Sequence, residues 1–173
     1  MTADEAFPPS SQGDALVAEL RWVHDMIRRD LATLRRLAEA VRDGLPPFEA
    51  VATIQELATH GPLWQMRMNC LRHCHFVESH HLAETHHLFP RLRRINPALA
   101  PVIDKLDADH VVVAGHLEEI ETAATALGEL GTPEQRSRLI DSLETLSRDL
   151  LTHLDFEEEH ISPTLRTLTH WPI

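Results

Sequence analysis

The sequence predicts an all-α protein, an antiparallel up-and-down four-helix bundle, and three observations support this fold class. Glycine is scarce, with 6 in 173 residues, and tyrosine is absent, whereas leucine, alanine, arginine and glutamate are plentiful. This composition favours helices over strands. Apolar residues recur every three or four positions over long stretches, which is the period of a helix with one buried face. The breaks between these stretches are short, so consecutive helices should pack as antiparallel neighbours.

Four long helices are expected, over residues 14–42, 63–94, 98–127 and 133–168. The apolar stripes of the first, third and fourth are Leu16, Leu20, Val23, Ile27, Leu31 and Leu34; Ile103, Leu106, Val113, Leu117, Ile120, Ala124 and Leu127; and Leu139, Leu143, Leu146, Leu150 and Ile161. The run Thr132-Pro133-Glu134-Gln135 predicts a helix start with a capping box. A short extra helix is expected over residues 47–59, where it would cover the join between the first two long helices.

The length allows one domain, which we place at residues 14–170 after a disordered N-terminal tail at 1–13. The formal net charge is -11 and no basic patch is visible, which argues against a nucleic-acid partner. No apolar run approaches the ~20 residues that span a bilayer, and no signal peptide is visible, so we expect no membrane partner. Cys70 and Cys74 are four apart on a helix, where a disulfide would be strained. We expect a cytoplasmic protein, as a monomer or weak homo-oligomer.

Polar residues interrupt the apolar stripes at one place in each long helix. His24 lies in the first stripe, His110 in the third, and His153 and Glu157 in the fourth, while His80 and Glu84 share one face of the second helix. At 1.5 Å rise per residue, the distances of these histidines from the neighbouring helix ends differ by only about 3–5 Å. His80, His110 and His153 should therefore lie at one level of the bundle. His75 and His86 point elsewhere and should be solvated.

Burying several imidazoles and two carboxylates without a partner would cost several kcal/mol, and a bound cation removes that cost. Imidazole and carboxylate ligands without cysteine suit iron, manganese or zinc. Six protein ligands are too many for one tetrahedral zinc ion, and two carboxylates able to bridge favour two iron ions. The sequence therefore predicts a dinuclear metal site, in which zinc or manganese could replace iron.

These residues resemble the hemerythrin-like, or HHE cation-binding, family. The matching segments are His24 with its following residues, His80-His81-Leu82-Ala83-Glu84 before Leu88-Phe89-Pro90, Asp109-His110, and His153-Leu154-Asp155-Phe156-Glu157. The resemblance covers the chain from about Leu16 to Leu168. It implies a four-helix bundle with a non-haem, oxo- or hydroxo-bridged di-iron centre that binds dioxygen, peroxide or nitric oxide.

Carried over by position, the resemblance implies a specific set of metal ligands. His24 and His80 would bind one iron, His110 and His153 the other, and Glu84 and Glu157 would bridge the two. Oxygen-carrying hemerythrins have a second histidine four residues later on the third helix, where this chain has Ala114. This departure predicts a more open second iron, and His81 at the edge of its stripe is the candidate for a further ligand.

Alternatives remain for the metal site and for the function. A ferritin-like site would use Glu84-x-x-His87 and Glu157-x-x-His160, but the other two helices offer histidines rather than glutamates. Within the hemerythrin-like class, the expected function is oxygen or redox sensing, storage or detoxification. A peroxidase- or catalase-like enzyme and an iron-homeostasis protein are the alternatives. With no tyrosine in the chain, Cys70, Cys74 or Trp64 could serve such an enzyme as an electron relay, although core packing is the expected role of these residues.

Overall fold

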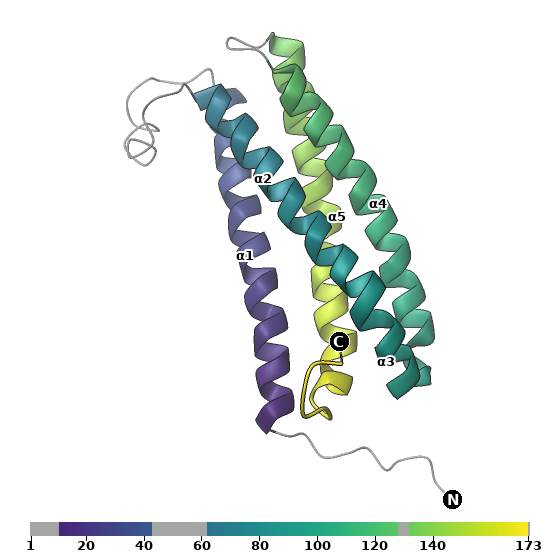
Figure 1. Ribbon diagram of the computed structural model, residues 1–173. Helices are drawn as coiled ribbons and strands as arrows, with labels where there is room; N and C mark the ends of the chain where they lie inside the picture. Colours follow the sequence, from purple (N-terminus) through teal and green to yellow (C-terminus); the bar gives the residue numbers. More distant parts are fainter. Residues whose placement is uncertain (1–10, 43–61, 128–131, 173) are drawn as a thin grey trace, which may run out of the picture.

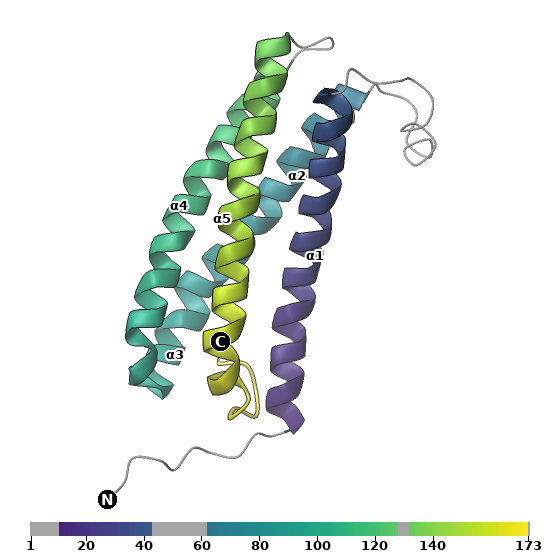
Figure 2. The same ribbon diagram turned by 180° about the vertical axis from the view of Figure 1, so that it is seen from behind.

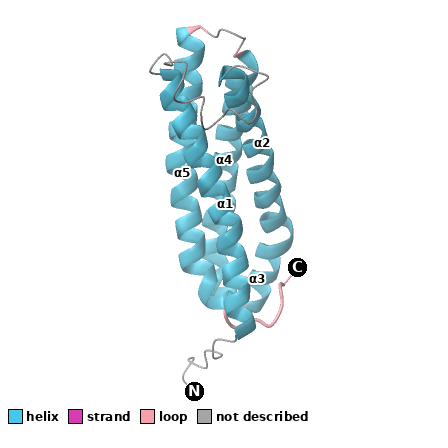
Figure 3. Ribbon diagram, turned by 90° about the vertical axis from the view of Figure 1, so that its left-hand side faces the viewer, coloured by secondary structure: helices cyan, strands magenta, loops and turns pink. Residues whose placement is uncertain are grey.

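The structure is a computed structural model that describes residues 11–42, 62–127 and 132–172. Its elements are α1 (Ser11–Arg42), α2 (Pro62–Ala83), the π-helical turn η2 (Glu84–Leu88), α3 (Phe89–Ile95), the 3₁₀ turn η3 (Pro97–Leu99), α4 (Ala100–Ala126) and α5 (Pro133–Leu165). Within these ranges there is no strand (Figure 3), so the predicted all-helical fold is confirmed. The short helix expected over 47–59 lies outside the described residues, as do residues 1–10 of the expected tail.

The four long helical segments form a ring in which each has two neighbours. α1 packs against α2 and α5, and α4 packs against the same two helices. The colours of Figure 1 show α1 and α4 running in one direction and α2 and α5 in the other. From behind, α5 lies between α1 and α4 (Figure 2). Among the described residues, no helix combines the length and the apolarity that a membrane crossing requires.

Local sequence signals explain where the helices begin and end. At the start of α5, the Thr132 side chain accepts a hydrogen bond from the Gln135 backbone N–H, and the Gln135 side chain accepts one from the Thr132 N–H. This is the predicted capping box, which satisfies donors that have no partner within the helix. After α3 ends at Ile95, the Asn96 side chain accepts a hydrogen bond from the backbone N–H of Ala98 and so begins the η3 turn.

Helix α1 begins at Ser11, three residues before the predicted boundary of the tail. The reason is a close approach between α1 and the C-terminal end of α5. A Cβ atom on Gly13 would lie 2.1 Å from the carbonyl oxygen of Arg166, so only glycine fits there. The Arg166 guanidinium also lies 3.2 Å from the Asp14 carboxylate. These contacts hold the first turn of α1 against the bundle.

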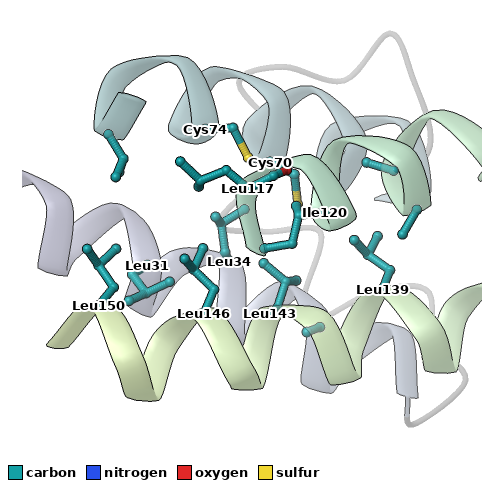
Figure 4. Packing of buried hydrophobic residues seen from close by; sticks show 14 of the residues in the cluster. Leu31, Leu34, Cys70, Cys74, Leu117, Ile120, Leu139, Leu143, Leu146 and Leu150 are labelled. Atoms are coloured by element: carbon teal, nitrogen blue, oxygen red, sulfur yellow. Dashed lines mark hydrogen bonds between the residues drawn. The ribbon is translucent and has the colours of Figure 1, made fainter. Parts of the chain in front are cut away.

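The apolar core is divided into two clusters along the bundle. The first contains Ile27, Leu31 and Leu34 of α1 together with Cys70, Cys74, Leu117, Ile120, Leu139, Leu143, Leu146 and Leu150 (Figure 4). The second contains Val17, Leu20, Leu88, Phe89, Leu92, Ile103, Leu106, Ile161 and Leu165. All the predicted stripe residues are buried except Val23, which is half-buried. On every long helix the buried residues between the two clusters are polar, and they form the layer described below.

The predicted second helix over 63–94 is interrupted by the η2 turn. A π turn accommodates one more residue than an α-helical turn, and such turns are frequent at functional sites. Here the turn starts at Glu84 and ends at Leu88, and both residues are buried. The apolar pattern does not reveal this interruption, because the residues on either side of it keep a helical period.

Candidate metal centre

The polar layer between the two apolar clusters contains all seven predicted ligands. His24, His81, Glu84, His110, His153 and Glu157 are buried, and His80 is nearly so, with a side chain 11% exposed. Their nitrogen and oxygen atoms form two groups, each with ligand atoms within 4.8 Å of one another. The first group is His24, His80, Glu84 and Glu157, and the second is His81, Glu84, His110 and His153. The layer therefore offers two neighbouring cation positions.

The first group lies between α1, α2 and α5. His80 Nε2 is 3.1 Å from Glu84 Oε1, because residues four apart lie on the same face of a helix. His24 Nε2 is 3.4 Å from Glu157 Oε2. The two imidazole rings are edge to face, with centroids 5.2 Å apart. Two histidines and two carboxylates thus point toward one position.

The second group contains three histidines. His110 Nε2 lies 3.2 Å from His153 Nε2, so the two nitrogens face the same point from α4 and α5. The His81 ring is stacked on His110, with centroids 4.0 Å apart, and is edge to face with His153 at 5.0 Å. Three imidazoles and a carboxylate oxygen of Glu84 surround this position.

The two carboxylates lie between the groups, as bridging ligands would. Glu84 belongs to both, because its Oε1 atom faces His80 and its Oε2 atom lies 3.4 Å from His110 Nε2. Glu157 Oε2 is 3.4 Å from His24 Nε2 and 3.7 Å from His153 Nε2. Each carboxylate therefore lies near one histidine from each group.

His81 approaches the centre in place of the histidine that oxygen-carrying hemerythrins have on the third helix and that this chain lacks. Ala114, four residues after His110, is exposed on α4. His81 instead approaches the second position from α2 and is only 6% exposed. We expected the missing histidine to leave the second position more open. The structure places His81 there, which leaves the first position with fewer histidines than the second.

The donor atoms fit a cation because, within the part of the chain that the structure describes, they have no hydrogen-bond partner. The buried atoms without a hydrogen bond include His24 Nε2, His80 Nε2, His81 Nε2 and both carboxylate oxygens of Glu84 and Glu157. Leaving such atoms unpaired in a protein interior costs several kcal/mol. Imidazole nitrogens and carboxylate oxygens are ligands of iron, manganese and zinc. This set of unpaired donors is the feature that a pair of cations would satisfy.

Outer partners fix the orientation of two of the rings. His24 Nδ1 is 2.9 Å from Glu158 Oε1, and Arg28 donates to the same oxygen at 2.7 Å. Thr85 Oγ1 donates to Asp107 at 3.1 Å, so His110 Nδ1, 2.8 Å from Thr85 Oγ1, acts as the donor in that contact. Each ring then has its Nε2 lone pair directed at the metal position.

Sequence reasoning did not identify these outer partners, because none of them lies in an apolar stripe. Glu158 directly follows the ligand Glu157, and Thr85 directly follows Glu84. Asp109, which precedes His110, has its Oδ2 atom 3.6 Å from His153 Nδ1, too far for a hydrogen bond. A polar residue next to a candidate ligand is the only sequence signal that Glu158 and Thr85 share.

Burial and the neighbouring ionisable groups together set the protonation of the layer. Burial would lower the pKa of His24, but Glu157 and Glu158 together raise it. For the other four histidines burial prevails: it lowers the pKa of His80 to about 4 and that of His110 to about 3, and it also lowers the pKa values of His81 and His153. These rings are therefore neutral at neutral pH, which is the form that binds metals. Burial and the charge of Glu157 raise the pKa of Glu84. Burial alone would raise the pKa of Glu157 too, but the neighbouring His24, His153 and His80 together outweigh burial and lower that pKa.

The other histidines of the predicted second and fourth helices lie outside the centre. His75 and His86 are exposed, as predicted. His87 is exposed as well, and His160 Nδ1 is 2.8 Å from the Phe156 carbonyl oxygen, so the structure gives no support to the ferritin-like ligand pairs. His73 is buried but belongs to neither group of ligand atoms.

Comparison with known protein families agrees with this centre. The family model of the hemerythrin HHE cation binding domain matches residues 15–165, which is most of the chain. The chain therefore belongs to the hemerythrin HHE family of cation-binding domains. No curated protein and no solved structure matches it.

Proposed function

We propose that the chain is a non-haem di-iron protein that binds dioxygen, or a related small ligand such as peroxide or nitric oxide, in oxygen or redox sensing, storage or detoxification. The observation that carries this proposal is the shared position of Glu84. Its two carboxylate oxygens face histidines of different groups, and both oxygens lack a hydrogen-bond partner. A bridging carboxylate between two ions satisfies both oxygens at once.

Each residue of the layer has a role in this proposal. His24 and His80 hold one iron, His81, His110 and His153 hold the other, and Glu84 and Glu157 bridge them. When bound, the iron pair supplies two-electron chemistry toward dioxygen or peroxide. Glu158 keeps the proton of His24 on Nδ1, and the two apolar clusters limit the access of water to the layer. The first position has two histidines, so it keeps room for the small ligand.

The peroxidase-like alternative needs an electron relay, and the described thiols are poorly suited to that role. Cys70 and Cys74 are free, at most 1% exposed, and burial raises the pKa of each thiol to about 12. Thiols in this state do not react as thiolates. Free thiols agree with the cytoplasmic placement that forms part of our proposal.

Metal stoichiometry tests the proposal. Metal-free protein titrated with ferrous iron under nitrogen should bind two iron ions per chain, measured by elemental analysis after desalting. Glu84→Ala should no longer hold the pair, because it removes a ligand shared by both positions. His75→Ala and His86→Ala are matched controls on the same helical segment and should keep the full iron content. Two iron ions in Glu84→Ala, or a single zinc ion and no iron uptake in the wild type, would contradict the di-iron assignment.

The optical spectrum after exposure to air distinguishes the two functions. A change that reverses under vacuum supports a binder of dioxygen. Immediate and irreversible oxidation, followed by sustained consumption of added hydrogen peroxide, supports the enzyme instead.

A further inference from the structure

A cavity of about 410 Å³ lies beside the first metal position, on the side of the bundle formed by α1, α2 and η2. It is lined by Glu19, Leu20, Trp22, Val23, His80, Ala83, Glu84, Leu88 and Trp171. His80 and Glu84 belong to the first group of ligands, so the cavity reaches the metal centre. No residue of the second group other than the shared Glu84 lines it.

The cavity is much larger than a diatomic ligand requires. A water molecule takes about 30 Å³ of liquid volume, whereas sites for small organic molecules measure about 300–1,000 Å³. The walls are mostly apolar, and two of the three tryptophans of the chain contribute to them. The size and the lining together match an organic molecule with an aromatic ring.

The charges around the cavity narrow the class of ligand. Among the described residues of the lining there is no lysine or arginine, and the carboxylates are Glu19 and the proposed metal ligand Glu84. Glu19 accepts a hydrogen bond from Trp171 Nε1, which ties the C-terminal segment to α1 and closes one wall. In the metal-free protein, an anion would meet the carboxylates of Glu19 and Glu84 and no positive side chain of the described lining. In the metal-loaded protein, a cation would approach the positive metal ions, so an uncharged molecule is the class that suits both states.

We propose that this cavity binds an uncharged aromatic molecule whose ring lies next to His80 and the first metal position. The cavity and its lining are features of the protein chain alone. Only its role beside a reactive centre rests on the di-iron function proposed above. The chain would then bring an organic substrate or effector to the iron pair, rather than the small ligand alone.

Ligand-observed ¹⁹F NMR of the full-length protein tests this proposal without relying on activity. The probes are fluorobenzene, 4-fluorobenzoate and 4-fluorobenzylammonium, which share a ring and differ in charge. We expect saturable broadening of the fluorobenzene signal, in metal-free and in iron-loaded protein, and weak or absent effects for the two charged probes. Equal or tighter binding of either charged probe would overturn the assignment of ligand class.

Matched substitutions place the binding in the cavity. Ala83→Phe fills the cavity and should abolish binding, whereas Leu82→Phe adds the same ring at an exposed neighbour outside the lining and should leave binding unchanged. Trp22→Ala should weaken fluorobenzene binding by about tenfold through the loss of ring contacts. Phe76→Ala removes an aromatic ring outside the lining and should leave fluorobenzene binding unchanged. Binding that survives Ala83→Phe, or is lost equally in both members of a pair, would refute the proposal.

The two proposals fail in different ways. If iron binds with the expected stoichiometry but no fluorobenzene binds, the cavity assignment is wrong and the di-iron function stands. If fluorobenzene binds and iron does not, the di-iron function is wrong and the cavity assignment stands.

Discussion

At the scale of single residues, the candidate metal centre depends on the groups that orient the proposed ligands as well as on those ligands themselves. Glu158 is the clearest case, because it accepts a hydrogen bond from His24 Nδ1 and forms an ion pair with Arg28. A carboxylate in this place fixes the tautomer of the ring and makes its Nε2 atom a stronger ligand. The neighbouring carboxylate of Glu159 is exposed. Two adjacent glutamates thus differ in their contacts with the centre.

We therefore expect Glu158→Gln to lower the affinity for iron by about tenfold or more, with little change in the helical content. The measurement is competition for ferrous iron with a chelator of known affinity, together with circular dichroism. Glu159→Gln is the matched control and should behave as the wild type. Equal affinities in all three proteins would show that Glu158 does not support His24.

His73 gives the metal-free protein a dependence on pH that is separate from metal binding. The ring is 2% exposed, neither ring nitrogen has a hydrogen-bond partner among the described residues, and burial lowers its pKa from 6.5 to about 4. Between these two pKa values the unfolded chain binds the proton and the folded chain does not. Stability due to neutral His73 is therefore present above pH 6.5 and is lost as the pH falls toward 4.

The expected loss from this one residue is about 2 kcal/mol between pH 7 and pH 5. Urea unfolding of metal-free protein at the two pH values measures it. His73→Leu should reduce the loss by about this amount, whereas His75→Leu, at an exposed position, should not change it. If His73→Leu shows the full loss, another group is responsible for the pH dependence.

At the scale of elements, the sequence predicted the helices and the burial of most of the candidate ligands, because both follow from periodicity. The stripes placed His24, His110, His153 and Glu157 correctly in the interior, since a polar residue within an apolar stripe has to be buried. His81 lay at the edge of its stripe, and the pattern could not decide whether it faces the centre. The η2 turn and the outer partner Thr85 depend on backbone and side-chain hydrogen bonds that periodicity does not report.

Gly13, at the contact between α1 and the end of α5, and Gly115 in α4 should respond in opposite ways to substitution by alanine. Gly13→Ala would place a Cβ atom 2.1 Å from the Arg166 carbonyl oxygen, and backbone cannot move aside cheaply. We expect a loss of about 1–3 kcal/mol in the free energy of unfolding. Gly115 in α4 has nothing within 4 Å of such an atom, so Gly115→Ala should stabilise the protein by about 0.5–1 kcal/mol.

Urea unfolding of the two variants under the same conditions tests this pair. Opposite signs are the expected outcome. A neutral Gly13→Ala substitution would mean that the first turn of α1 can detach from α5 without cost.

At the scale of the whole molecule, the bundle consists of two apolar clusters separated by a polar layer. The layer contains more unpaired donors and acceptors than a stable core tolerates. Without metal, the middle of the bundle is therefore its weakest part, while the two clusters on either side remain well packed. Cation binding should stabilise the fold as a whole.

Removal of metal should lower the melting temperature. At free metal one hundred times above Kd, binding contributes about 2.7 kcal/mol, which corresponds to about 5–10 °C for a domain of this size. Differential scanning calorimetry with and without a chelator measures the shift. Glu84→Ala should show a much smaller shift, and the same shift in that variant would place the stabilising ion elsewhere.

The polar layer also has a consequence for how such a chain tolerates insertions and deletions. Each helix contributes its ligands at one level, with apolar residues fixed on both sides of them. Deleting one residue between His24 and Ile27 would rotate the helix on one side of the deletion by about 100° relative to the other and shift it by about 1.5 Å. The ligand and the core could then no longer both face inward. Changes in length are therefore expected to accumulate between the helices, and the middle of each helix to vary only by substitution.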